Sequence, residues 1–118
     1  MVEIIEPNFK FCDERGSFAQ LVREGYRQIN VLISKAGIKR GGHYHKLNRE
    51  AFYVIGGSLD LLVNTETESK TYHFKTGEMF VILPLTVHEL QFTEDTVMVS
   101  MYDKGVEMED GEKDIYSS

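Results

Sequence analysis

Apolar and polar residues alternate along most of this chain with the two-residue period of β-strands, in which neighbouring side chains point to opposite faces. Some stretches are instead apolar throughout, which is typical of strands buried on both faces. The stretches that show one or the other pattern are 28–35, 52–55, 59–63, 72–74, 79–83 and 97–101. The pattern therefore predicts a chain built from strands.

Turn-forming residues separate these stretches, with glycine in most of the turns. The breaks fall at Gly16, Gly37, Gly41-Gly42, Gly56-Gly57, 64–70, Gly77 and 93–95. No window has the 3.6-residue apolar period of an amphipathic helix. About nine or ten short strands in roughly 100 residues predict an all-β sandwich or barrel.

The length of 118 residues corresponds to one domain, residues 1–118. Its core is expected over about 9–103. The acidic stretch 104–118 is poor in apolar residues and is interpreted as a tail or an edge segment. Because so small a domain leaves much of its surface exposed, a homodimer is also expected.

The net charge of −6 disfavours nucleic-acid binding, which depends on lysine and arginine neutralising phosphates. Residues 35–49 nevertheless contain five basic residues and no acidic one, which indicates either a solvated rim or a site for an anion such as a diphosphate. Cys12 is the only cysteine, so no intrachain disulfide is expected. The sequence has no apolar run of membrane-spanning length and no leader pattern at its start, so we expect a cytoplasmic protein that does not bind membranes.

Three of the four histidines form a metal-binding pattern with one glutamate. His43 and His45 are two residues apart, so on a strand both rings point to the same face. Glu50 opens the next strand, and His88 begins a distant one that a closed barrel can bring to the same point. Three imidazoles and a carboxylate suit one divalent transition metal, zinc first, with iron, manganese, cobalt or nickel as alternatives. The fourth histidine, His73, lies on a polar face and is predicted to be exposed and uninvolved.

The same residues resemble the cupin superfamily. Gly37, His43-x-His45, Glu50 and Gly57 have the spacing of the first cupin motif, and Gly77, Pro84 and His88 are similar to the second, with Thr86 in place of its glycine. The resemblance implies a small cupin, or jelly-roll β-barrel, with His43, His45, Glu50 and His88 as metal ligands.

Within the cupins, the chain resembles enzymes that act on nucleotide-linked deoxysugars. The segments Asp13–Gln20, Gln28–Gly37 and Arg40–His45 are similar to the dTDP-4-dehydrorhamnose 3,5-epimerases, to sugar-nucleotide 3,4-ketoisomerases and to the cupin domains of capsular polysaccharide enzymes. The last group is the best match, because the rhamnose epimerases lack the second histidine and the metal. The resemblance implies an epimerase or ketoisomerase of a nucleotide-linked 4-keto-6-deoxy sugar in surface polysaccharide biosynthesis.

The resemblance also implies roles for individual residues. Arg15, Phe18 and Arg40 would bind the nucleotide diphosphate, although Phe18 fits a core aromatic equally well. His43 would serve as the base if it does not bind metal; Tyr102 and Tyr53 are further candidates for acid or base. Two other functions fit a metal cupin: an iron-dependent dioxygenase or other small-molecule enzyme, and a non-catalytic ligand sensor.

Overall fold

The computed structural model describes residues 1–118 and consists of strands joined by turns and loops. The first sheet has the order β1 (Val2–Ile5), β9 (Met79–Ile82), β6 (Glu50–Gly56), β11 (Thr96–Tyr102) and β4 (Gln28–Ser34). The second has the order β12 (Tyr116–Ser117), β5 (Lys39–Tyr44), β10 (Val87–Phe92), β7 (Ser58–Asn64) and β8 (Ser69–Lys75). Two further strands, β2 (Phe9–Asp13) and β3 (Gly16–Gln20), pair only with each other. The all-β prediction is confirmed, and no helix capable of crossing a bilayer is present.

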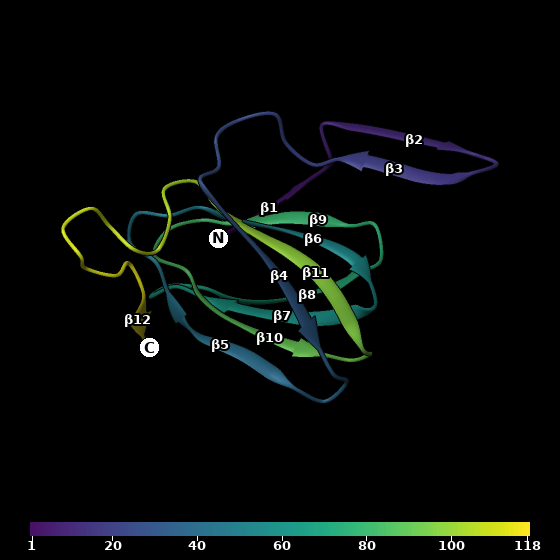
Figure 1. Ribbon diagram of the computed structural model, residues 1–118. Helices are drawn as coiled ribbons and strands as arrows, with labels where there is room; N and C mark the ends of the chain where they lie inside the picture. The colour runs from purple at the N-terminus through teal and green to yellow at the C-terminus, as the bar shows by residue number, and fades with distance from the viewer.

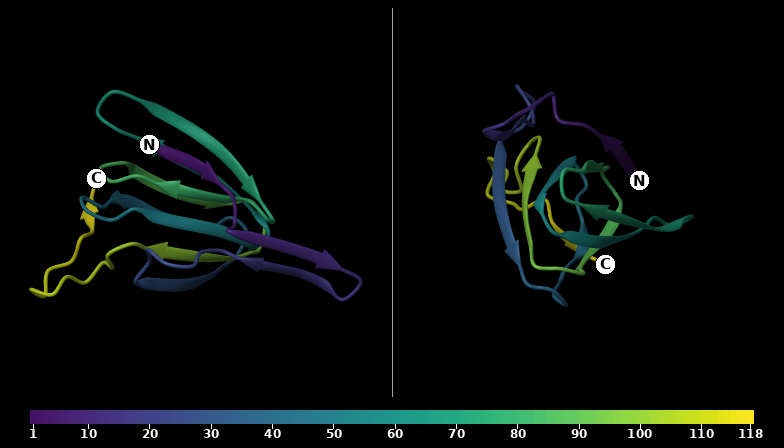
Figure 2. Two further views of the ribbon diagram at one scale, coloured as in Figure 1. Left: turned by 90° about the horizontal axis from the view of Figure 1, so that it is seen from above. Right: turned by 90° about the vertical axis from the view of Figure 1, so that its right-hand side faces the viewer.

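The two five-stranded sheets face each other and enclose the core (Figures 1 and 2). Alternate residues of their strands point inward, as the two-residue period requires. Three phenylalanines join the layers: Phe74 of the second sheet stacks on Phe80 of the first with ring centroids 4.0 Å apart, and Phe80 stacks on Phe52 at 5.0 Å. The buried cluster between the sheets comprises Phe52, Val54, Leu59, Leu61, Val63, Phe74, Phe80, Ile82, Leu90, Phe92 and Met98.

A second apolar cluster lies on the outer face of the first sheet. Ala51, Met79, Val81 and Met101 are buried there, and the segment that leads into β4 covers them with Leu21, Val22 and Tyr26. This outer packing explains why 79–83 is apolar on both faces. Beyond the covered area, Ile29, Val31 and Ile33 of β4 remain largely exposed.

The structure contains twelve strands where the sequence predicted nine or ten. The strands at the chain ends, β1 and β12, have only four and two residues, too few for an alternating pattern to identify them. The acidic segment 104–118 ends in β12, an edge strand in which Tyr116 pairs with Tyr44 of β5. One of its residues, Asp114, is only 2% exposed and lies inside the protein.

The β2–β3 hairpin extends away from the two sheets (Figures 1 and 2). Its three phenylalanines, Phe9, Phe11 and Phe18, are 47–59% exposed and add nothing to the core between the sheets. The interpretation of Phe18 as a core aromatic is therefore wrong, because the strand that carries it pairs only within the hairpin.

Gly57 lies in the turn between β6 and β7, and its substitution tests how much this turn contributes to stability. Its φ is +114°, and a Cβ there would lie 2.6 Å from the Asp95 carbonyl oxygen and 2.7 Å from the Thr96 Cα. We expect Gly57→Ala to lower the free energy of unfolding by at least about 2 kcal/mol, because it combines backbone strain with overlap against main-chain atoms. The measurement is denaturant unfolding followed by circular dichroism.

The neighbouring Gly56 is the matched control, since a Cβ there meets nothing within 4 Å and its φ is not positive. Gly56→Ala should leave stability within about 0.5 kcal/mol of wild type. Equal, small effects of both substitutions would contradict the argument.

Candidate metal centre

Strand pairing brings the four predicted ligands to one end of the space between the sheets. His43, near the end of β5, pairs directly with His88 of β10, and a register shift follows between His88 and Glu89. Glu50 begins β6 and pairs with Tyr102 of β11. His45 lies in the loop that connects β5 to β6. Each sheet therefore contributes to the cluster, and the face-to-face packing closes it.

The ligand atoms of His43, His45, Glu50 and His88 all lie within 4.8 Å of one another. The Nε2 atoms of His45 and His88 are 3.3 and 3.5 Å from the same oxygen, Oε1 of Glu50. Atoms bound to one transition metal at about 2.0–2.2 Å lie at comparable separations from each other. Three of the residues are buried, while His43 is half-buried and faces the opening.

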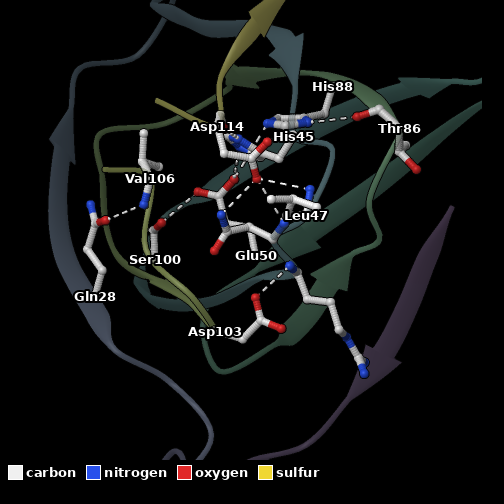
Figure 3. A network of polar contacts seen from close by, with 12 residues as sticks. Gln28, His45, Leu47, Glu50, Thr86, His88, Ser100, Asp103, Val106 and Asp114 are labelled. Carbon is white, nitrogen blue, oxygen red and sulfur yellow. Dashed lines mark hydrogen bonds and ion pairs between the residues drawn. The ribbon is translucent and has the colours of Figure 1, made fainter. Parts of the chain in front are cut away.

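Backbone carbonyls set the orientation of two of the rings (Figure 3). The Nδ1–H of His45 donates to the carbonyl of Asp114 at 2.7 Å, and the Nδ1–H of His88 donates to the carbonyl of Thr86 at 3.1 Å. A carbonyl can only accept, so in both rings Nδ1 carries a proton, and the neutral form of each ring directs its Nε2 lone pair at Glu50. Two lone pairs and a carboxylate oxygen then meet at one point, and only a positive charge, a proton or a metal ion, makes that arrangement favourable.

Glu50 is held as a carboxylate. Its second oxygen, Oε2, accepts a hydrogen bond from the Ser100 hydroxyl at 2.6 Å. Burial on its own would raise the pKa of Glu50, but the hydrogen bond with His45, the charge of His88 and the bond from Ser100 lower it overall. The negative charge therefore persists at neutral pH in a position where it can bind a cation.

The three imidazoles differ in their affinity for protons. Burial, followed by repulsion from His88 and His45, lowers the pKa of His43 to about 4, and burial also lowers the pKa of His88. Burial opposes protonation of His45 as well, but the hydrogen bonds to Glu50 and Asp114 raise its pKa overall. Neutral imidazole is the form that binds metals, so His43 and His88 are ready ligands at neutral pH.

A pocket of about 480 Å³ opens beside the cluster. His43, Glu50 and His88 lie on its wall, together with Arg40 and Tyr102. The Nε of Arg40 donates to Ser34 Oγ at 2.9 Å, which holds the guanidinium at the pocket edge. The structure thus brings one of the three predicted substrate-binding residues to the candidate metal centre.

Of the two tyrosines considered as acid or base, only Tyr102 faces the pocket. Its ring packs edge-on against His45, and burial together with the Glu50 charge raises its pKa, so its hydroxyl stays protonated. Tyr53 packs against the outer cluster of the first sheet, on the face opposite Glu50. Tyr53 cannot act at this site, and that candidate assignment is wrong.

Arg15 and Phe18 lie elsewhere, on the β2–β3 hairpin. Arg15 forms an ion pair with Asp13 at 2.7 Å, and both line a separate hollow of about 540 Å³ with the hairpin phenylalanines. Neither residue lines the pocket beside His43. The fourth histidine, His73, is exposed and pairs with Asp60, as expected of a residue outside the site.

No sequence pattern identifies the residues that support the candidate ligands. Ser100 and Asp114 bond directly to Glu50 and His45. Asp114 is one of several acidic residues in 104–118, and nothing in the local sequence distinguishes it from its exposed neighbours. Its carboxylate accepts bonds from the backbone N–H groups of Lys46, Leu47 and Asn48 at 2.8–3.0 Å.

The chain matches one known protein family. Residues 11–114 match the family described as polysaccharide biosynthesis C-terminal domain. A search of the curated proteins finds no match.

Solved structures with the same fold include three sugar-nucleotide enzymes. A double mutant of a 3,4-ketoisomerase from Thermoanaerobacterium thermosaccharolyticum, in complex with TDP, has a TM-score of 0.75 and 23% identity, covering 86% of this chain and 79% of that one. A TDP-quinovose 3,4-ketoisomerase from Campylobacter jejuni has a TM-score of 0.83 and 14% identity, covering 99% and 92%. A dTDP-4-dehydrorhamnose 3,5-epimerase from Sulfolobus tokodaii has a TM-score of 0.72 and 22% identity, covering 86% and 69%. These likenesses confirm the predicted cupin jelly-roll fold.

Proposed function

The chain belongs to the polysaccharide biosynthesis C-terminal domain family, and on this premise we propose that it is a metal-dependent isomerase of nucleotide-linked sugars. Its substrate would be a 4-keto-6-deoxy sugar, and its reaction an epimerisation beside the ketone or a shift of the ketone along the ring. The observation that carries this proposal is the convergence of His43, His45, Glu50 and His88 beside an open pocket, whose wall includes all of them except His45. The structural neighbours named as ketoisomerases and epimerases support the same class of chemistry.

The metal would be held by three imidazole nitrogens and the Oε1 atom of Glu50, with zinc as the first candidate. The donor set fits, because two Nε2 lone pairs and a carboxylate already face one another across 3.3 and 3.5 Å. When bound, a divalent ion supplies Lewis acidity that favours negative charge on a sugar ketone oxygen as the neighbouring C–H bond loses its proton.

The chain's own residues would perform the remaining tasks. Arg40 at the pocket edge presents a guanidinium that can bind the substrate diphosphate through paired hydrogen bonds. Tyr102, with its raised pKa, keeps its proton and can donate a hydrogen bond to a developing oxyanion. His43 is the most exposed member of the cluster and can serve either as a ligand or as the base, but not as both at once.

We also propose that the protein is a homodimer. Arg15 and Phe18, assigned to nucleotide binding by resemblance, lie on the β2–β3 hairpin, which extends away from the two sheets (Figure 1), and neither lines the pocket beside His43. They can contribute to a nucleotide site only if the hairpin reaches the pocket of a second copy. The exposed phenylalanines of the hairpin and the exposed Ile29, Val31 and Ile33 of β4 provide apolar surface for that contact.

Metal content is the first test. Purified protein should contain close to one transition-metal ion per chain by plasma mass spectrometry, because the four donors form a closed set around one point. His45→Ala should lose the ion, whereas His73→Ala, which alters the histidine outside the cluster, should retain it. Substoichiometric metal that zinc, manganese, iron, cobalt and nickel all fail to restore would contradict the metal centre.

Proton exchange tests the reaction. In D₂O with a nucleotide-linked 4-keto-6-deoxyhexose, wild-type protein should introduce deuterium at the carbon beside the ketone, since epimerisation and ketone shift both begin by removing that proton. His43→Ala should abolish exchange whether His43 is ligand or base. Arg40→Ala should chiefly raise KM, by roughly ten- to a hundredfold, because a charge-assisted bond to phosphate contributes about 1.5–3 kcal/mol.

His73→Ala is again the matched control and should exchange at the wild-type rate. If fully metallated protein shows no exchange above the buffer rate with several such sugars, the isomerase proposal fails. Oxygen uptake by the ferrous form would then indicate a dioxygenase, and binding without turnover would indicate a sensor.

Assembly is tested by light scattering. At micromolar concentration the protein should have twice the chain mass of 13.6 kDa. Phe18→Asp should shift it toward the monomer by placing a charge in the apolar contact, while Thr71→Asp, on the exposed outer face of the second sheet, should not. A wild-type mass near that of a single chain would rule out the dimer.

A further inference from the structure

The loop that joins two of the four candidate ligands is tied to the far end of the chain. Residues Lys46–Arg49 connect His45 to Glu50, and the carboxylate of Asp114 accepts three successive backbone N–H groups of this loop, at 2.8, 3.0 and 3.0 Å. Asp114 is 2% exposed, so these bonds are shielded from water. The loop therefore takes its shape around a side chain 66–68 residues away in sequence.

Asn48, a residue of this loop, adds further hydrogen bonds between the loop and the C-terminal segment. Its side-chain amide donates to Asp114 Oδ2 at 2.8 Å and to the Gly105 carbonyl at 2.9 Å. Its Oδ1 accepts the backbone N–H groups of Lys104 and Gly105 at 3.0 and 2.9 Å. Asn48 is 1% exposed, and all its side-chain hydrogen-bonding groups are paired. The C-terminal segment is thus attached to the loop at two points, residues 104–105 and residue 114.

The backbone carbonyl of Asp114 bonds to the imidazole of His45. The Asp114 carbonyl accepts the Nδ1–H of His45 at 2.7 Å, while its carboxylate binds the N–H groups that follow His45 (Figure 3). The carboxylate fixes where residue 114 lies, and the carbonyl then fixes which ring nitrogen of His45 carries the proton. Without this acceptor, a neutral imidazole has no reason to keep its proton on Nδ1.

We infer that Asp114 is a positioning residue of the candidate metal centre, which holds His45 with Nδ1 protonated and Nε2 directed at the point shared with Glu50 and His88. The ion itself rests on the proposed function, but the orientation of His45 does not. Residues that orient a metal-binding histidine typically contribute ten- to a hundredfold to metal affinity.

The first experiment measures the tautomer directly in chelator-treated protein. Nitrogen-15 NMR of the histidine side chains at pH 8 should show wild-type His45 with its Nδ1 fully protonated, and no fraction of this ring that carries its proton on Nε2 alone. In Asp114→Ala the same ring should become a mixture dominated by Nε2–H, the form that water favours. Asp110→Ala is the matched control, because Asp110 is an exposed aspartate of the same segment whose carboxylate bonds only to the Glu112 backbone. It should leave the wild-type tautomer unchanged.

The second experiment measures affinity for Co²⁺ by competition with a chelator, followed by the visible absorption of the bound ion. Asp114→Ala should bind about ten- to a hundredfold more weakly than wild type and Asp110→Ala equally well. Asp114→Asn retains the carbonyl and one side-chain acceptor, so it should keep more of the affinity and of the Nδ1–H tautomer. This variant also decides the question if Asp114→Ala does not fold.

Wild-type tautomer and wild-type Co²⁺ affinity in a folded Asp114→Ala protein would overturn the inference. So would an Asp114→Asn protein that loses affinity while His45 keeps its tautomer, since the loss would then have another cause. If wild-type protein binds no metal at all, the proposed metal dependence fails, whereas the tautomer measurement still supports or overturns the role of Asp114.

Discussion

A buried point toward which two imidazole lone pairs and a carboxylate oxygen are directed is the constraint on which this structure depends. Placed together without a cation, these groups repel one another, and their burial limits screening by water. The protein nevertheless assigns a backbone carbonyl to His45 and another to His88, so that each ring exposes Nε2 toward Glu50. Because of this repulsion, the arrangement is favourable only around a positive charge. The surrounding strands and loops hold the three groups in place.

The two sheets supply the rigidity that such an arrangement needs. Stacked phenylalanines join the layers beneath the site, and strands β5, β10 and β6 each place one candidate ligand at a fixed backbone position, with β11 paired alongside β6. His45 alone comes from a loop, and that loop is the one bound by Asp114 and Asn48. Ligands on strands require little further support, whereas the ligand on a loop receives it from the end of the chain.

Much of the site could be predicted from the sequence, and its limits have physical causes. The His43-x-His45 spacing identified both residues, although only His43 lies on β5 and His45 begins the loop that follows it. The parity of Glu50 and Tyr53, three apart on one strand, already places them on opposite faces, so Tyr53 could have been excluded on that ground. Tyr102 faces the site because β11 pairs with β6 in the register that sets it opposite Glu50, which no local pattern specifies.

Strand periodicity and the His-x-His spacing are properties of neighbouring residues, so the all-β architecture and the candidate ligand set follow from the sequence alone. The protonation of Nδ1 in His45 and His88, the burial of Asp114 and the extension of the β2–β3 hairpin away from the sheets all depend on the tertiary structure. The Asp114 bond to His45 spans 69 residues and uses a backbone carbonyl, a group that every residue carries. The packing of the sheets and the position of the C-terminal segment determine which carbonyl bonds to which imidazole. This pairing therefore forms only in the complete fold.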